Sequence, residues 1–268
     1  STIAGGMDNV MTTQAVASAI GGGRLNTVSN TSLYATISGG ERNTIDNTDS
    51  ATIAGGSKNS ILNESDASAI NGGMDNTITT SAVASAIGGG RSNTITSTSL
   101  YGTIGGGERN TINNTDTATI SGGSKNTIIN ESDASSINGG IDNTITTSSL
   151  SSAIGGGRSN TITSSIDASI IGGGHSNTIS NNSVYATVSG GILNTINNTD
   201  SSIIGGGAKN TITEESDAST IGGGMDNTIT TSAIASVIGG GRSNTITSNS
   251  LYGSISGGQL NSIADADS

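Results

Sequence analysis

The fold is decided by a short stretch that recurs along the whole chain. Residues 87–95 give its clearest copy, Ile-Gly-Gly-Gly-Arg-Ser-Asn-Thr-Ile. In every copy an apolar anchor precedes the Gly pair, an Asn follows the anchor by six residues, and a second apolar residue follows it by eight. The anchors are Ile3, Ile20, Ile37, Ile53, Ile70, Ile87, Ile104, Ile120, Ile137, Ile154, Ile171, Val188, Ile204, Ile221, Ile238 and Ile255. Because a disordered tract has no reason to keep three positions in register, this period indicates an ordered repeat protein.

The spacing of the apolar residues predicts two short strands in each copy. Successive anchors are 17 residues apart, except for three intervals of 16. Apolar residues at the anchor and eight places later, β-branched and flanked by small or polar residues, are typical of strands with one buried face. We therefore predict an all-β fold, a parallel β-solenoid of about 16 coils with 16–17 residues and two short strands per coil. Residues 1–268 would form a single repeat domain, expected to be a segment of a longer fibrous protein.

Composition excludes several classes of function. The 268 residues include 42 Gly, but no Pro, Phe, Trp or Cys, which rules out disulfides and thiolate metal sites. A net charge of -11 with only nine Lys and Arg argues against nucleic acid and anionic membranes as partners. No apolar run approaches the roughly 20 residues that cross a bilayer. We expect no membrane insertion.

The Asn six residues after each anchor is interpreted as structural. Its position next to a Gly-Gly corner favours an inward ladder, with each amide bonding the neighbouring coil, over a set of surface ligands. The predicted ladder comprises Asn9, Asn26, Asn43, Asn59, Asn76, Asn93, Asn110, Asn126, Asn143, Asn160, Asn177, Asn194, Asn210, Asn227, Asn244 and Asn261.

Acidic residues gather at the other corner of some coils. An Asp stands four residues before several anchors, and neighbouring coils would stack these carboxylates beside a Glu. The candidate clusters are Asp49, Glu64 and Asp66; Asp116, Glu131 and Asp133; and Asp200, Glu215 and Asp217. Oxygen-only clusters suit Ca²⁺, and the alternative is a solvated acidic edge. We predict no other cofactor.

Other coils carry an aliphatic residue followed by Tyr at this corner. The pairs are Leu33 and Tyr34, Leu100 and Tyr101, Val184 and Tyr185, and Leu251 and Tyr252. Exposed apolar pairs repeated along a solenoid indicate a contact with another copy of the chain, or a binding site for sugar or another surface. Small residues beside the anchors, such as Ala86 and Gly88, would leave a smooth face for the same contact.

The residues that usually support catalysis are scarce, so we expect no enzyme. His175 is the only His and would lie on a corner. The carboxylates recur in triplicate along an edge instead of converging in one cleft, which suits acid–base chemistry poorly.

Ser-Ala-Ile-Gly-Gly-Gly-Arg-Ser-Asn-Thr-Ile, found at residues 85–95 and 152–162 and with one change at 236–246, resembles the GGGxxNT repeats of phage tail fibres and bacterial surface proteins. It is similar, more distantly, to the head β-roll of trimeric autotransporter adhesins, whose coil is shorter. The resemblance implies a homotrimeric, adhesive or structural fibre at a cell surface or on a virion. It also implies extracellular attachment to a glycan or receptor.

Two rival interpretations stay open. Seven coils carry a Thr-x-Thr pair, as Thr94 and Thr96 do, which resembles the face of ice-binding solenoids, although Asp46, Leu62 and Ile129 interrupt the array. The Gly-Gly corner also resembles that of calcium-bound RTX rolls, but Asn replaces the metal-binding Asp in every copy.

Overall fold

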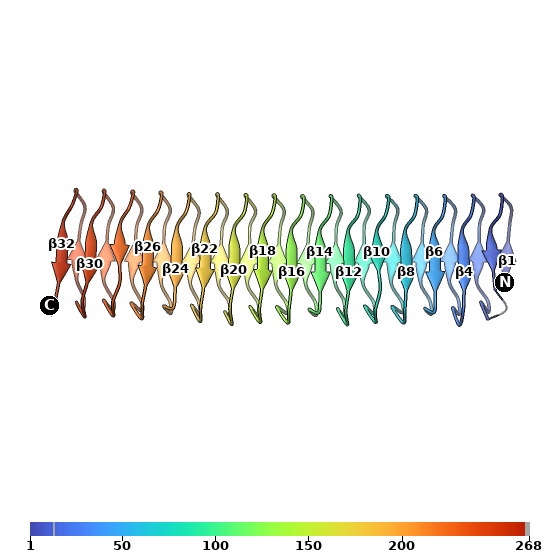
Figure 1. Cartoon of the computed structure of the whole chain (residues 1–268), viewed down its shortest axis with the longest axis horizontal. Helices are drawn as coiled ribbons and strands as arrows, with labels where there is room; N and C mark the ends of the chain where they lie inside the picture. Colours follow the sequence, from blue (N-terminus) through green and yellow to red (C-terminus); the bar gives the residue numbers. More distant parts are fainter. Residues whose placement is uncertain (13, 266–268) are drawn as a thin grey trace. The chain divides into compact units, whose positions relative to one another are not determined.

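The computed structural model describes residues 1–12 and 14–265, and within them every regular element is a β-strand. Contacts divide the chain into two compact units, Ser1–Ala134 and Ser135–Ser268. Each unit is a parallel β-solenoid in which every coil supplies one strand to each of two sheets (Figure 1). The predicted fold class is confirmed, whereas the single repeat domain stays a prediction. The described residues contain no helix that could span a membrane.

In unit 1 the anchors lie on the first sheet and the second apolar residues on the second sheet. The strands of the first sheet are β1 (Thr2–Ile3), β3 (Ala19–Ile20), β5 (Thr36–Ile37), β7 (Thr52–Ile53), β9 (Ala69–Ile70), β11 (Ala86–Ile87), β13 (Thr103–Ile104) and β15 (Thr119–Ile120). Those of the second are β2 (Val10–Met11), β4 (Thr27–Ser29), β6 (Thr44–Asp46), β8 (Ser60–Leu62), β10 (Thr77–Ile78), β12 (Thr94–Thr96), β14 (Thr111–Asn113) and β16 (Thr127–Ile129).

Unit 2 repeats this arrangement. The strands of its first sheet are β17 (Ser136–Ile137), β19 (Ala153–Ile154), β21 (Ile170–Ile171), β23 (Thr187–Val188), β25 (Ile203–Ile204), β27 (Thr220–Ile221), β29 (Val237–Ile238) and β31 (Ser254–Ile255). Those of its second sheet are β18 (Thr144–Thr146), β20 (Thr161–Thr163), β22 (Thr178–Ser180), β24 (Thr195–Asn197), β26 (Thr211–Thr213), β28 (Thr228–Ile229), β30 (Thr245–Thr247) and β32 (Ser262–Ala264).

Adjacent coils pair in strict register. In β11 and β13, Ala86 lies beside Thr103 and Ile87 beside Ile104. The backbone N–H of Gly88 donates to the carbonyl of Ile104 at 2.8 Å, in the next coil. A shift by one residue would turn each anchor to solvent, so the buried face fixes the register.

The core is a double row of β-branched side chains between the two sheets. Ile87 and Ile95 of one coil are both 0% exposed. Neither sheet is wide enough to bury these residues alone, so each coil is stabilised by the coils on either side of it. The coil turns at two corners (Figure 1), which we call the first corner (residues 88–93 in the coil of Ile87) and the second corner (residues 97–102).

Candidate functional site

The first corner is held by the Asn side chain. In the coil of Ile87, Asn93 Nδ2 donates to the carbonyls of Gly89 at 2.9 Å and of Gly107, in the next coil, at 3.0 Å. Its Oδ1 accepts the backbone N–H of Asn110 at 3.0 Å. Equivalent bonds link coil after coil in each unit, and the Asn side chains form a ladder whose members are buried except for Asn9 and Asn261.

The last Gly of the first corner has no room for a side chain. Gly90 has φ +86°, and a Cβ there would overlap the carbonyl oxygen of Gly107. The same overlap recurs at the matching Gly of the neighbouring coils. Glycine is therefore required at this place by both its backbone conformation and the packing of the next coil.

All nine basic residues of the chain lie on first corners, and all are exposed. They are Arg24, Arg42, Lys58, Arg91, Arg109, Lys125, Arg158, Lys209 and Arg242. Glu41 pairs with Arg42 at 3.4 Å and Glu108 with Arg109 at 3.7 Å, each within its own coil. Pairs this exposed contribute little to stability.

The second corner differs from the first because its length varies. Most 17-residue coils carry two left-handed residues after the second-sheet strand, as at Ser97 and Thr98 (φ 58° each). The three 16-residue coils carry one, at Asn47, Asn114 or Asn198. Shortening by one residue recesses the edge of the coil at these three places.

Each recess is an open groove between taller neighbours. The grooves around Asn114, Asn47 and Asn198 have volumes of about 400, 290 and 190 Å³. The first is lined by Ser81, Val83, Thr98, Leu100, Asn114, Thr115, Asp116, Glu131 and Asp133. The second is lined by Thr31, Leu33, Asn47, Thr48, Asp49, Glu64 and Asp66, and the third by Asn182, Asn198, Thr199, Asp200, Glu215 and Asp217. The structure thus joins residues that the sequence presented as separate acidic and apolar features.

The Asp residues of the grooves accept hydrogen bonds from the backbone of the preceding coil. Asp116 Oδ1 accepts the backbone N–H of Leu100 at 2.9 Å, and Asp133 Oδ1 accepts that of Asp116 at 2.7 Å. Asp49 and Asp66, and Asp200 and Asp217, repeat these bonds. Each Asp is thus fixed by a structural bond, while Glu64, Glu131 and Glu215 extend into solvent.

These carboxylates do not assemble into a metal centre. Across residues 1–12 and 14–265, no group of three or more His, Cys, Asp or Glu is placed so that it could hold a metal ion. The Oδ1 atom of each Asp already accepts a backbone N–H. The arrangement is that of an acidic groove wall, and the Ca²⁺ hypothesis stays a prediction without geometric support.

The four predicted Tyr residues project from second corners. Their exposures are 66% for Tyr34, 63% for Tyr101, 65% for Tyr185 and 66% for Tyr252. All four have φ of 56–58°, a conformation that is unfavourable for bulky residues. In this conformation the N–H of Tyr101 donates to the carbonyl of Val83 at 3.0 Å. Other residues at the same place, such as Ser50 and Ala67, have the same left-handed conformation.

A buried row of hydroxyls beneath the second corner escaped the sequence reasoning. Ser99 Oγ donates to the carbonyl of Thr96 at 2.6 Å and accepts the N–H of Thr115 at 3.3 Å. In the three shortened coils Thr48, Thr115 and Thr199 take this place, and their Oγ1 atoms are buried without a hydrogen-bond partner. The Ser or Thr five residues before most anchors was the available signal.

The outer face of the second sheet is more regular in unit 2. Seven successive strands, β18 to β30, place Thr at the first outward position and Thr, Ser or Asn at the second. In unit 1 Asp46, Leu62 and Ile129 occupy second positions. The outer face of the first sheet carries mainly small residues, except where Ile170, Ile203 and Val237 are exposed.

No protein-family model matches the chain, and no curated protein sequence matches it significantly. The functional proposal therefore rests on the sequence and the geometry.

Proposed function

We propose that the chain is a non-catalytic structural segment of an extracellular or virion fibre. Identical chains would lie side by side in this fibre. The fibre would bind a glycan or receptor at a cell surface. The observation that carries the proposal is the division of labour within each coil. The Ile core and Asn ladder are the same in coil after coil, while charged and aromatic residues are displayed along the edges.

This division suits a fibre for a physical reason. Each coil bonds only its neighbours, so length is gained by adding coils without redesigning a core. Side chains on the edges are then repeated at a fixed interval, which favours multivalent contact with another repeated surface. The resemblance of the repeats to phage and bacterial surface fibres supports the same function.

Light scattering of the 26.1 kDa chain tests the proposal. A mass near three chains is expected, unchanged by a Ca²⁺ chelator if assembly depends on side-chain contacts alone. A folded chain that stays at 26.1 kDa over the whole accessible concentration range would contradict it.

The Thr array of unit 2 favours a second candidate, ice binding. Thr161 lies beside Thr144 on one side and Thr178 on the other, and Thr213 Oγ1 is 2.9 Å from Thr230 Oγ1. A flat, in-register set of hydroxyl and methyl groups is the kind of surface that can match an ordered water lattice.

Thermal hysteresis separates the two candidates. Ice binding predicts measurable hysteresis that is lost when Thr178 and Thr211, which lie on the outer face of β22 and β26, are both replaced by Lys. The fibre proposal predicts no hysteresis in either protein. Replacement of Thr36 and Thr103, on the outward face of the other sheet, by Lys is the matched control.

A further inference from the structure

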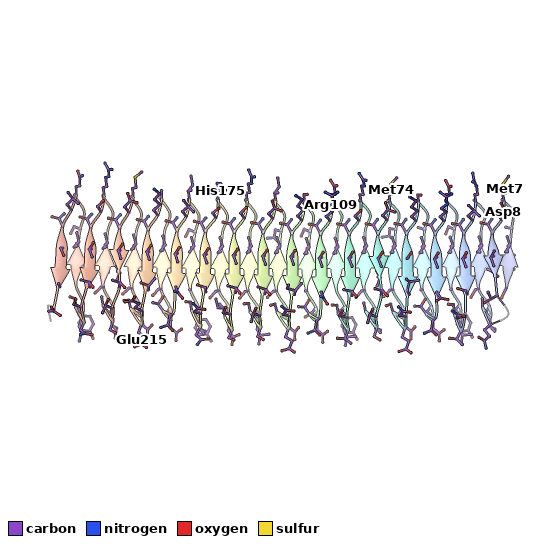
Figure 2. All side chains as sticks on the ribbon, viewed as in Figure 1. Met7, Asp8, Met74, Arg109, His175 and Glu215 are labelled. Atoms are coloured by element: carbon purple, nitrogen blue, oxygen red, sulfur yellow. The ribbon has the colours of Figure 1, made fainter. Side chains whose placement is uncertain are left out.

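The two corners of a coil carry matched residue types although they lie on opposite edges. Figure 2 shows this separation in unit 2, where His175 projects from one edge and Glu215 from the other. In unit 1 the coil of Met7 has Val16 at its second corner, and the coil of Met74 has Val83. Met7, Met74 and Val16 are 60%, 45% and 57% exposed. A first corner with an exposed Met, which stands beside Asp8 or Asp75, is therefore followed by a second corner with Val.

In unit 1 the coil that follows each Met coil pairs a cation with an aromatic ring. Arg24 on the first corner is followed by Tyr34 on the second, and Arg91 is followed by Tyr101. All four side chains are exposed. A guanidinium over a Tyr face is a favourable contact, but the two members of each pair are held on opposite edges of their own coil.

The other two coils between one Met coil and the next pair a first-corner cation with second-corner carboxylates, and in two of these coils the cation, Arg42 or Arg109, also pairs with a Glu on its own first corner. The first-corner cation comes first in each pair, and the pairs are Arg42 with Asp49, Lys58 with Glu64 and Asp66, Arg109 with Asp116, and Lys125 with Glu131 and Asp133. As a result the first corners of unit 1 carry six basic and four acidic residues. The second corners of unit 1, from Asp49 to Asp133, carry six acidic residues and no basic one.

Unit 2 keeps the match with different residues. Its pairs are Ile141 with Leu150, Arg158 with Asp167, His175 with Tyr185, Lys209 with Glu215 and Asp217, Met225 with Ile234, and Arg242 with Tyr252. The coil of Ile192 and Asp200 is an exception.

A neighbouring chain would bring each pair together. If two identical chains lie parallel and in register, the first corner of each coil in one faces the second corner of the same coil in the other. Met then meets Val, Arg meets Tyr, and Lys meets Glu, at intervals of about 4.8 Å. Such complementarity fixes both partner and register.

We propose that identical chains associate in parallel and in register, with the first corners of one chain against the second corners of the next. The inference rests on the proposed fibre function and names its interface. Because the two edges differ, the contact is heterologous, and it closes into a ring such as a trimer if the rotation between neighbours allows.

Charge exchange along the two edges tests the proposal by sedimentation velocity of the full chain. One variant carries Lys58→Glu, Lys125→Glu and Lys209→Glu, a second carries Glu64→Lys, Glu131→Lys and Glu215→Lys, and a third carries all six changes. The six residues are left-handed, with φ of 55–60°, and no change introduces or removes Gly. Backbone strain is therefore the same in all variants, and circular dichroism checks that each is folded.

Each triple variant is expected to have a dissociation constant at least tenfold higher than that of the unmodified chain, because like charges then face each other. The six-fold variant is expected to recover assembly. A control with Thr36→Lys, Thr103→Lys and Thr187→Lys adds positive charge to the outer face of the first sheet and should still assemble.

Three results would overturn the inference. Triple variants that assemble like the unmodified chain, or a six-fold variant that stays dissociated, would show that the corners do not meet. Loss of assembly in the control alone would place the contact on the sheet face. A monomeric unmodified chain would instead refute the fibre function itself, so the two failures are distinguishable.

Discussion

The first and second corners solve the same geometric problem with different tolerance. At the first corner Asn93 ties three backbone groups together and Gly90 admits no Cβ, so both its length and its residues are fixed. At the second corner the chain takes two or three left-handed residues, and the side chains there range from Ala to Tyr. The comparison teaches that the first corner specifies the stack, whereas the second corner is free to carry surface chemistry.

A charge in the core between the two corners should have the largest effect. Ile104 is 0% exposed, and Ile104→Asp should lower the free energy of unfolding by more than about 4 kcal/mol, because a carboxylate is buried without a partner. Thr103→Asp, on the outward face of the same strand, is the control and should change it by about 0.5 kcal/mol or less. Urea unfolding and limited proteolysis measure both. Unchanged protease resistance in the Ile104 variant would refute the two-sheet core.

Loss of the amide at the first corner should come next. Asn93→Ala removes the acceptor for Asn110 N–H and the donors to Gly89 and Gly107, and should cost about 2–4 kcal/mol. At the second corner, Thr98→Ala should cost about 0.5 kcal/mol or less because Thr98 is exposed. Equal losses of unfolding free energy in the two variants would remove the distinction between the corners.

Relief of backbone strain at the second corner should stabilise the fold. Tyr101 has φ 57°, and Tyr101→Asn should raise the free energy of unfolding by about 0.5–1 kcal/mol, since Asn tolerates this conformation better. Unfolding is measured at a concentration where light scattering reports single chains. A loss above about 1 kcal/mol would mean that the ring stabilises its own chain by packing.

The smallest effect is expected at an exposed first-corner side chain that makes no part of the Asn ladder. His175→Ala should leave the free energy of unfolding within about 0.5 kcal/mol of the unmodified value. A larger loss in thermal or urea unfolding would show that first-corner surface residues, as well as Asn and Gly, hold the stack.

The sequence was sufficient for the fold because each structural demand recurs at every coil. Burial of Ile87 and Ile95 and the bonds of Asn93 repeat with one period, and a period is visible without coordinates. The grooves were not predictable in the same way. An interval of 16 residues shows that one residue is missing, but only the heights of the neighbouring coils reveal that a recess opens beside Asn114.

The residue roles at the second corner also depended on geometry. The sequence grouped Asp116 and Asp133 as stacked carboxylates of a candidate Ca²⁺ cluster, whereas the structure shows each accepting a backbone N–H from the preceding coil. A short Asp side chain reaches this N–H only because the corner is folded back by left-handed residues. No residue pattern predicts this left-handed conformation, since Ala, Ser, Thr and Tyr all adopt it.

Deletion of a single residue from each corner tests the central claim most directly. Deletion of Thr98 converts its coil to the 16-residue form already present at Asn114, whereas deletion of Ser92 shortens the corner that Asn93 closes. We predict that the Thr98 deletion unfolds cooperatively within about 1 kcal/mol of the unmodified chain, and that the Ser92 deletion loses more than about 4 kcal/mol. Equal losses in urea unfolding, or a greater loss for the Thr98 deletion, would contradict the account.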